Sequence, residues 1–120
     1  VRGAIRPYLT MDLLWLEAIA KKYNEWPALL RSLTVGVSAF AIEPYAIGVV
    51  FRDEHGLRFG ALSDKDGMKS MIKICRFMVG GAIEMGVELH GHWQKDSWQA
   101  NLANRVGFVL NGRGYHVTEL

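Results

Sequence analysis

Residues 57–86 read LRFGALSDKDGMKSMIKICRFMVGGAIEMG and decide the fold, because they encode a strand, a turn and a long amphipathic helix in succession. Residues 57–63 favour a strand, and residues 64–67 combine the aspartate and glycine typical of a turn. Residues 68–85 carry helical periodicity, and Gly86 suits a left-handed helix cap. A further strand is expected from residue 87, so the stretch predicts a β-α-β unit.

The predicted helix has two distinct stripes. Its apolar residues recur at spacings of three and four: Met68, Met71, Ile72, Cys75, Met78, Val79 and Ala82. Lys69, Lys73 and Arg76 occupy the opposite stripe. We therefore expect Met71, Cys75, Met78 and Val79 to be buried against a sheet while the cationic side chains remain in solvent.

The rest of the chain switches between the apolar–polar alternation of strands and the apolar periodicity of helices. Its proline and glycine residues mark the boundaries. We expect strands at residues 5–9, 34–42, 45–52, 57–63, 87–93, 108–110 and 115–120, and helices at 12–24, 26–33, 68–85 and 97–106, the last capped by Asp96. This pattern predicts one domain over residues 1–120 of the α/β (α+β) class. Its order, β-α-α-β-β-β-α-β-α-β, gives a mixed, largely antiparallel central sheet flanked by helices.

Composition limits the partners and the compartment. The chain has 120 residues, is 50% hydrophobic and carries a net charge of +2, with its 14 basic and 12 acidic residues interspersed. This charge pattern argues against nucleic acid as a partner. No apolar run is long enough to span a bilayer, so no membrane partner is expected, and the single cysteine, Cys75, points to a reducing compartment. We therefore expect a cytoplasmic protein.

The order of elements resembles that of the GNAT superfamily of acetyl-CoA-dependent N-acetyltransferases. The opening Ile5-Arg6-Pro7 followed by Asp12 is similar to the I-R-P-x-x-x-x-D start of that superfamily. The segment 102–108, with Leu102, Arg105, Gly107 and Phe108, is similar to its last helix and the following Gly-Phe. The compact form especially resembles small GNAT-like proteins encoded by bacteriophages, some of them associated with virions. For such a protein the location would be the host cytoplasm or the virion.

The resemblance implies acetyl-CoA as the cofactor and places its binding site at the start of the central helix. The family's pyrophosphate motif, R/Q-x-x-G-x-G/A, falls on Asp64, Gly67 and Lys69, of which only Gly67 matches. Lys65, Lys69 and Lys73 suit the phosphates of CoA, although a solvated helix face explains them almost as well. The residues expected to contact the cofactor are Ala61, Leu62, Ser63, Gly67, Met68 and Lys69.

Departures from the family pattern weaken the expected activity. Asp64 replaces a basic or amide residue, and Ala103 stands where many members carry the tyrosine that protonates the departing thiolate. Gly60 marks either the β-bulge that polarises the thioester or simple packing. We expect weak or absent acetyl-CoA binding and low transfer to a small-molecule or peptide amine. The alternative is a non-catalytic structural or protein-binding protein, virion-associated in the phage case, that retains the fold.

Glu88, His90 and His92 alternate along one predicted strand and therefore share a face. One interpretation makes His90 the general base for the amine, with Glu88 tuning it. His-x-His is also metal-ligand spacing, although no further ligand cluster is visible and no metal is expected. We favour a solvated face, then catalysis, then metal binding. Trp93 and Trp98 flank the turn at residues 94–97 and either line a pocket or belong to the core.

Overall fold

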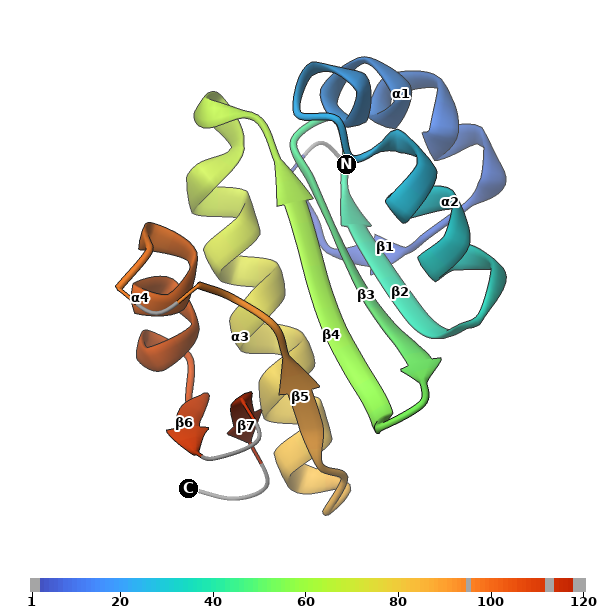
Figure 1. Cartoon of the computed structure of the whole chain (residues 1–120). Helices are drawn as coiled ribbons and strands as arrows, with labels where there is room; N and C mark the ends of the chain where they lie inside the picture. Colours follow the sequence, from blue (N-terminus) through green and yellow to red (C-terminus); the bar gives the residue numbers. More distant parts are fainter. Residues whose placement is uncertain (1–2, 95, 112–113, 118–120) are drawn as a thin grey trace.

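The strand–turn–helix unit predicted at residues 57–85 is present in the computed structural model of the chain (Figure 1). β4 spans Gly56–Ser63, the 3-10 turn η2 spans Lys65–Gly67, and α3 spans Met68–Glu84. The structure describes residues 3–94, 96–111 and 114–117. Turn residues, apolar spacing and the glycine at position 86 together therefore located both ends of the central helix closely.

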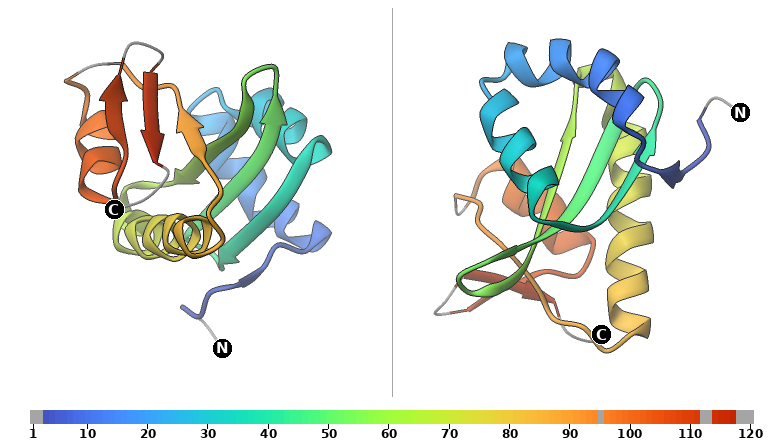
Figure 2. Two further views of the ribbon diagram at one scale, coloured as in Figure 1. Left: turned by 90° about the horizontal axis from the view of Figure 1, so that it is seen from below. Right: turned by 90° about the vertical axis from the view of Figure 1, so that its right-hand side faces the viewer.

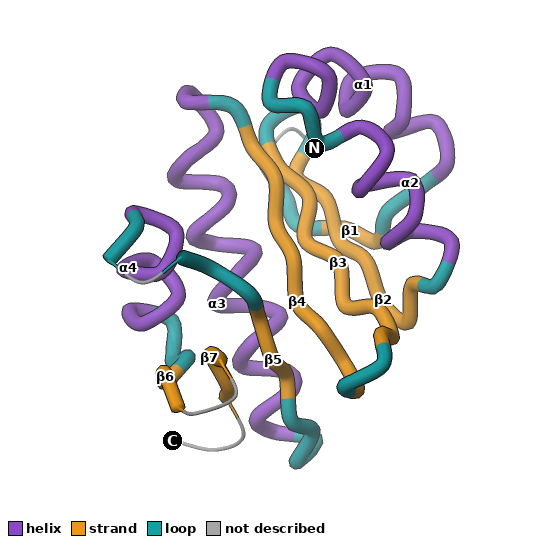
Figure 3. Tube along the Cα trace, viewed as in Figure 1, coloured by secondary structure: helices purple, strands orange, loops and turns teal. Residues whose placement is uncertain are grey.

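The described residues form a mixed α/β fold with one sheet and four α-helices (Figure 3). The strands lie in the order β1-β2-β3-β4-β5-β7-β6, and all neighbouring pairs are antiparallel except the parallel pair β4–β5. The expected class, a largely antiparallel sheet flanked by helices, is confirmed. The remaining elements are β1 (Arg6–Pro7), η1 (Thr10–Asp12), α1 (Leu13–Lys22), α2 (Trp26–Thr34), β2 (Gly36–Ile42), β3 (Ala46–Asp53), β5 (Leu89–Gly91), α4 (Trp98–Arg105), β6 (Val109–Asn111) and β7 (Gly114–Val117).

Some local predictions differ from the structure, and one reaches beyond the described residues. The strand expected at residues 87–93 is reduced to β5, because it meets β4 at one residue pair and then diverges. The cap of the last helix is Ser97 rather than Asp96, since the Ser97 hydroxyl accepts a hydrogen bond from the Ala100 amide at 3.1 Å. The end of the strand expected at residues 115–120 lies outside the described residues.

The helices lie in two layers (Figure 2). α1 and α2 pack on one face of the sheet, where Leu16, Ala20 and Leu29 meet Ile47 and Val49. α3 and α4 pack on the other face and enclose the larger core. Because side chains alternate along a strand, β3 contributes to both cores, with odd-numbered residues facing α1 and α2 and even-numbered residues facing α3.

Gly48 allows α3 to approach the sheet closely. A Cβ atom at this position would lie 2.5 Å from the Ile74 side chain and 2.6 Å from the Met78 sulfur, so only glycine fits beneath the helix. Met71, Cys75, Met78 and Val79 are buried as predicted, while Lys69, Lys73 and Arg76 are exposed. Burial raises the pKa of the Cys75 thiol to about 12. The thiol is therefore a structural part of the core.

A buried carboxylate joins the N-terminal segment to the first helix. Asp12 is only 1% exposed and accepts a bidentate pair of hydrogen bonds from the Arg6 guanidinium at 2.7 and 2.9 Å. It also accepts the Leu9 amide and the Trp15 indole N–H, each at 2.8 Å. Burial alone would raise the pKa of Asp12, but the bonds from Arg6, Leu9 and Trp15 outweigh it and lower the pKa. The Ile-Arg-Pro and Asp12 motif therefore has a structural role.

No helix in the described parts of the chain combines the length and the apolar character needed to cross a lipid bilayer.

Replacing Met78 by alanine tests the packing of α3. Met78→Ala should lower the free energy of unfolding by about 2–5 kcal/mol, because it leaves a cavity between the helix and Gly48. The control Lys73→Ala, on the exposed stripe of the same helix, should change it by less than about 0.5 kcal/mol. Urea unfolding followed by circular dichroism measures both, and equal losses would contradict the packing.

The Asp12 network predicts a stability that depends on pH. Because the folded state lowers the pKa of Asp12, its stabilisation is complete above the unfolded value of about 4 and is lost as pH falls through the lower folded value. Asp12→Asn should cost about 1–3 kcal/mol at neutral pH, because it removes hydrogen bonds to a charged group, and should flatten the acid limb of the stability curve. Urea titrations at successive pH values test this, and an unchanged acid limb in the variant would contradict it.

Candidate functional site

The sheet opens between β4 and β5. These parallel strands pair at only one position, Arg58 opposite His90, and beyond it β5 leads away toward α4 (Figure 1). The half of β4 from Phe59 to Ser63 therefore has no strand partner on its β5 side among the described residues. Its outward-facing amides and carbonyls are presented to the opening instead.

A cleft of about 760 Å³ occupies this opening. Its walls come from α2, β3, β4, the start of α3, and the segment between β5 and α4. Trp93 and Trp98 both line it. Trp93 also packs on the core, with its ring centre 5.0 Å from that of Phe108, so for this residue the pocket and core interpretations both hold. The lining residues used below are Glu25, Arg58, Gly60, Ala61, Leu62, Ser63, Asp64, Lys65, Met68, His92, Trp93 and Trp98.

The cleft meets the predicted cofactor segment only in part. Ala61, Leu62, Ser63 and Met68 are lining residues, whereas Gly67 and Lys69 are not. Gly67 is buried beneath the β2–β3 turn, where a Cβ atom would collide with the Tyr45 carbonyl oxygen. The one matching glycine of the phosphate motif is therefore required by packing. Lys69 is exposed, away from the cleft lining.

Asp64 occupies the start of the central helical segment. Its carboxylate accepts the Lys65 backbone amide at 2.7 Å and so caps η2, which runs directly into α3. The Tyr23 hydroxyl donates to the same carboxylate at 2.6 Å, and the Lys22 ammonium lies 3.0 Å away. These bonds, that from Tyr23 foremost, lower the pKa of Asp64 to about 2. A carboxylate thus already holds an amide that a phosphate group would use.

The cleft is close to electrically neutral. Arg58 and Lys65 are the cationic residues of the described lining, and Glu25 and Asp64 supply two negative charges. The Arg58 guanidinium lies over the Phe51 ring, 5.7 Å from its centre. With two tryptophans also in its lining, the cleft is suited to an uncharged or weakly charged ligand.

Gly60 does not form a bulge. β4 pairs with β3 without a register shift, from Gly56 opposite Asp53 to Ser63 opposite Ala46. A Cβ atom at Gly60 would make an ordinary contact of 3.6 Å with the Phe51 ring, so close packing does not require the glycine either. The bulge interpretation is therefore wrong for this ladder, and the structure supplies no other reason for the residue.

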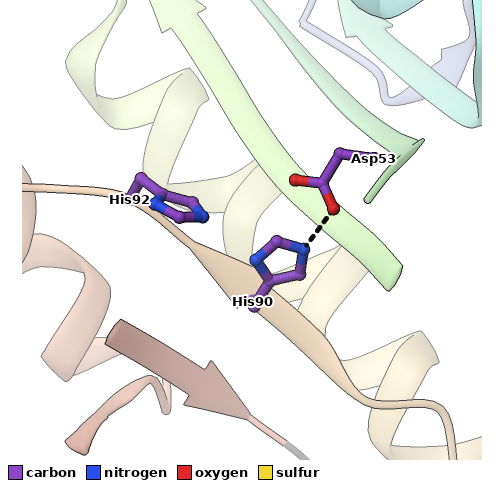
Figure 4. A group of neighbouring side chains, drawn as sticks. All are labelled: Asp53, His90 and His92. Carbon is purple, nitrogen blue, oxygen red and sulfur yellow. Dashed lines mark hydrogen bonds and ion pairs between the residues drawn. The ribbon is translucent and has the colours of Figure 1, made fainter. Parts of the chain in front are cut away.

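A cluster of histidines and one aspartate lies beside the β4–β5 contact (Figure 4). His90 Nε2 lies 3.0 Å from Asp53 Oδ1, and the ring centres of His90 and His92 are 5.3 Å apart. Asp53, His90 and His92 each offer a ligand atom, and these three atoms lie within 4.8 Å of one another. His55, in the β3–β4 turn, has its ring centre 6.2 Å from that of His90.

The cluster shifts the pKa values of two of its members. Burial, with Arg58 and His90 nearby, lowers the pKa of His92. Burial would raise the pKa of Asp53, but the His55 backbone amide and His90 outweigh it and lower the pKa. Both groups therefore favour their deprotonated forms, which can accept a proton or bind a cation.

The two predicted catalytic residues lie in different surroundings. His90 is 4% exposed and bonded to Asp53, so a solvated face is wrong for this residue. Glu88 is exposed and precedes β5. His92, rather than His90, lines the cleft. The catalytic roles of His90 and Glu88 stay predictions.

Asp53 is the functional candidate that sequence reasoning missed. It ends β3 opposite Gly56, at the edge of the turn between the strands expected at residues 45–52 and 57–63. Its contact with His90 requires β5 to lie next to β4, and 37 residues separate the partners. One signal in the sequence bears on this contact. Side chains alternate between the two faces of a hairpin, and this alternation places Asp53 and Arg58 on the same face of the sheet.

Comparison of the chain with models of protein families, with curated proteins and with solved structures finds no match.

Proposed function

We propose that the chain is a GNAT-like domain whose cleft between β4 and β5 accepts the thioester arm of an acyl carrier, with weak binding of acetyl-CoA and low acyl transfer to an amine. The observation that carries this proposal is the single residue pair between β4 and β5, beyond which the strands diverge around the cleft. The acceptor would be a small-molecule or peptide amine.

The unpaired half of β4 supports binding of an extended amide-containing arm. From Gly60 to Ser63 the strand has backbone donors and acceptors on its β5 side that no described strand pairs with. A pantetheine arm carries two amides and can add to such an edge as a short strand does. Trp93 and Trp98 provide apolar contact area in the cleft. The β4 edge and the two tryptophans can together bind a ligand that carries no charge.

The start of the central helix supports the weak-binding part of the proposal. The N-terminus of a helix attracts phosphate through free amides and its dipole. Here the Asp64 carboxylate occupies that place, and Lys22 and Tyr23 are already bonded to it. The phosphates of CoA would therefore meet the negative charge of Asp64. Lys22 would not be free to bind them, because it is already paired with that carboxylate.

Two further features support low transfer activity. β4 keeps an unbroken register with β3, so no bulged amide is available there to polarise a thioester. Ala103, which replaces the family's tyrosine, is a buried residue of α4 and offers no acid. Activity would therefore depend mainly on holding the two reactants together.

A second candidate function is protein binding without catalysis. Leu9, Met11 and Leu14 lie close together in sequence where the chain enters α1, and all three are exposed, Leu14 to 84%. Exposed apolar residues that gather in this way favour a protein partner. This candidate does not need the cleft to bind any acyl group.

Calorimetric titration with two thioesters tests the first proposal. Acetyl-CoA and S-acetylpantetheine should bind with dissociation constants within about threefold of each other. Only acetyl-CoA carries the nucleotide phosphates, and here they would not gain the ~1 kcal/mol that a helix N-terminus usually gives an anion. Asp64→Asn should tighten acetyl-CoA about fivefold and leave S-acetylpantetheine unchanged, since it removes the like charge yet keeps a capping side chain.

The matched control is Asp66→Asn, which makes the same charge change at an exposed residue of the same turn. It should have a smaller effect, because Asp66 is not the cap. Much tighter binding of acetyl-CoA than of S-acetylpantetheine by the unmodified chain would show a working phosphate site. Failure of both ligands to bind at millimolar concentration would contradict the thioester cleft.

A further inference from the structure

We propose that Asp53, His90 and His92 form a binding site for a divalent transition metal of the zinc class, with the open coordination position directed toward the cleft. This proposal goes beyond the thioester function and does not depend on it. It rests on the convergence of one carboxylate from the end of β3, one imidazole from β5 and one from the segment just after β5, beside the β4–β5 contact (Figure 4).

The sheet register brings the three side chains to one face. Asp53 lies opposite Gly56 in the β3–β4 ladder, and Arg58 lies opposite His90 in the β4–β5 pair. Because side chains alternate along a strand and opposite residues share a face, Asp53, Arg58 and His90 point to the same side. His92, just after β5, lies beside them, with its ring centre 5.3 Å from that of His90. Gly56 has no side chain to separate Asp53 from β5. The three ligand atoms therefore converge within 4.8 Å.

Two of the ligands are already close to their coordinating positions. His90 Nε2 and Asp53 Oδ1 are 3.0 Å apart, and the His55 backbone amide donates to the same oxygen at 2.8 Å. Ligand atoms around a tetrahedral zinc ion are roughly 3.4 Å apart, from bond lengths of about 2.0–2.1 Å. A metal ion would replace the proton shared by His90 and Asp53. His92 is exposed, so its ring can rotate to complete the set.

The donor set selects the class of metal. Two imidazole nitrogens and one carboxylate oxygen suit zinc, cobalt and nickel and are a poor set for magnesium or calcium, which prefer oxygen. Three protein ligands leave the fourth tetrahedral position for water or substrate. Since His92 lines the cleft and His90 is 4% exposed, the open position faces the cleft rather than the core.

Titration of the untagged full chain with zinc and with cobalt tests the site. We expect one zinc ion to bind per chain with a micromolar or lower dissociation constant, and cobalt to give the visible absorption bands of a tetrahedral complex. His92→Gln and Asp53→Asn should each weaken zinc binding by about tenfold or more, because each removes one of three ligands. Zinc should raise the melting temperature of the unmodified chain and not that of Asp53→Asn.

The matched control is His55→Gln. His55 is an exposed histidine whose ring centre is 6.4 Å from that of His92, and it tests for non-specific binding to surface imidazoles. The control should bind zinc with unchanged affinity. Absence of micromolar binding by the unmodified chain would overturn the proposal. Binding that persists in both His92→Gln and Asp53→Asn, or that requires His55 alone, would also overturn it.

Discussion

The close contact between α3 and β3 at Gly48 is the constraint on which the rest of the structure depends. Only a residue without a side chain lets Ile74 and Met78 reach the sheet at this position. The helix therefore lies directly on the strands that precede it, and the chain emerging from it returns beside β4 as β5. This return is parallel to β4, whereas all other neighbouring strands of the described sheet are antiparallel. The opening of the sheet begins at that one junction.

Both proposed sites lie along β4 and β5, one where the two strands are paired and the other where they separate. Where β4 and β5 touch, the register aligns Asp53, His90 and His92 on one face. Where they diverge, the backbone of β4 and the two tryptophans enclose the cleft. His92 belongs to both, because it is the last residue of the cluster and the first of the segment that lines the cleft. A ligand in the cleft would therefore lie beside the histidine cluster.

Two carboxylates accept several hydrogen bonds each, one at the start of α1 and one at its end. Asp12 gathers Arg6, Leu9 and Trp15 around a buried charge at the start of α1, and Asp64 gathers Lys22 and Tyr23 from its end. Buried or capping carboxylates are stable only when such donors surround them. The second of these networks ties α1 to the start of α3. It also places a negative charge where a phosphate-binding fold keeps its amides free.

The sequence by itself determined the local elements. Periodicity predicted the buried stripe of α3 and the α/β class, because these depend on spacings of two to four residues along the chain. It could not place Asp53 beside His90 or Lys22 beside Asp64, since 37 and 42 residues separate these pairs. Nor could it show that Gly67 serves packing against Tyr45. Only the tertiary structure decided these contacts, because they follow from which strands become neighbours and how closely a helix approaches a sheet.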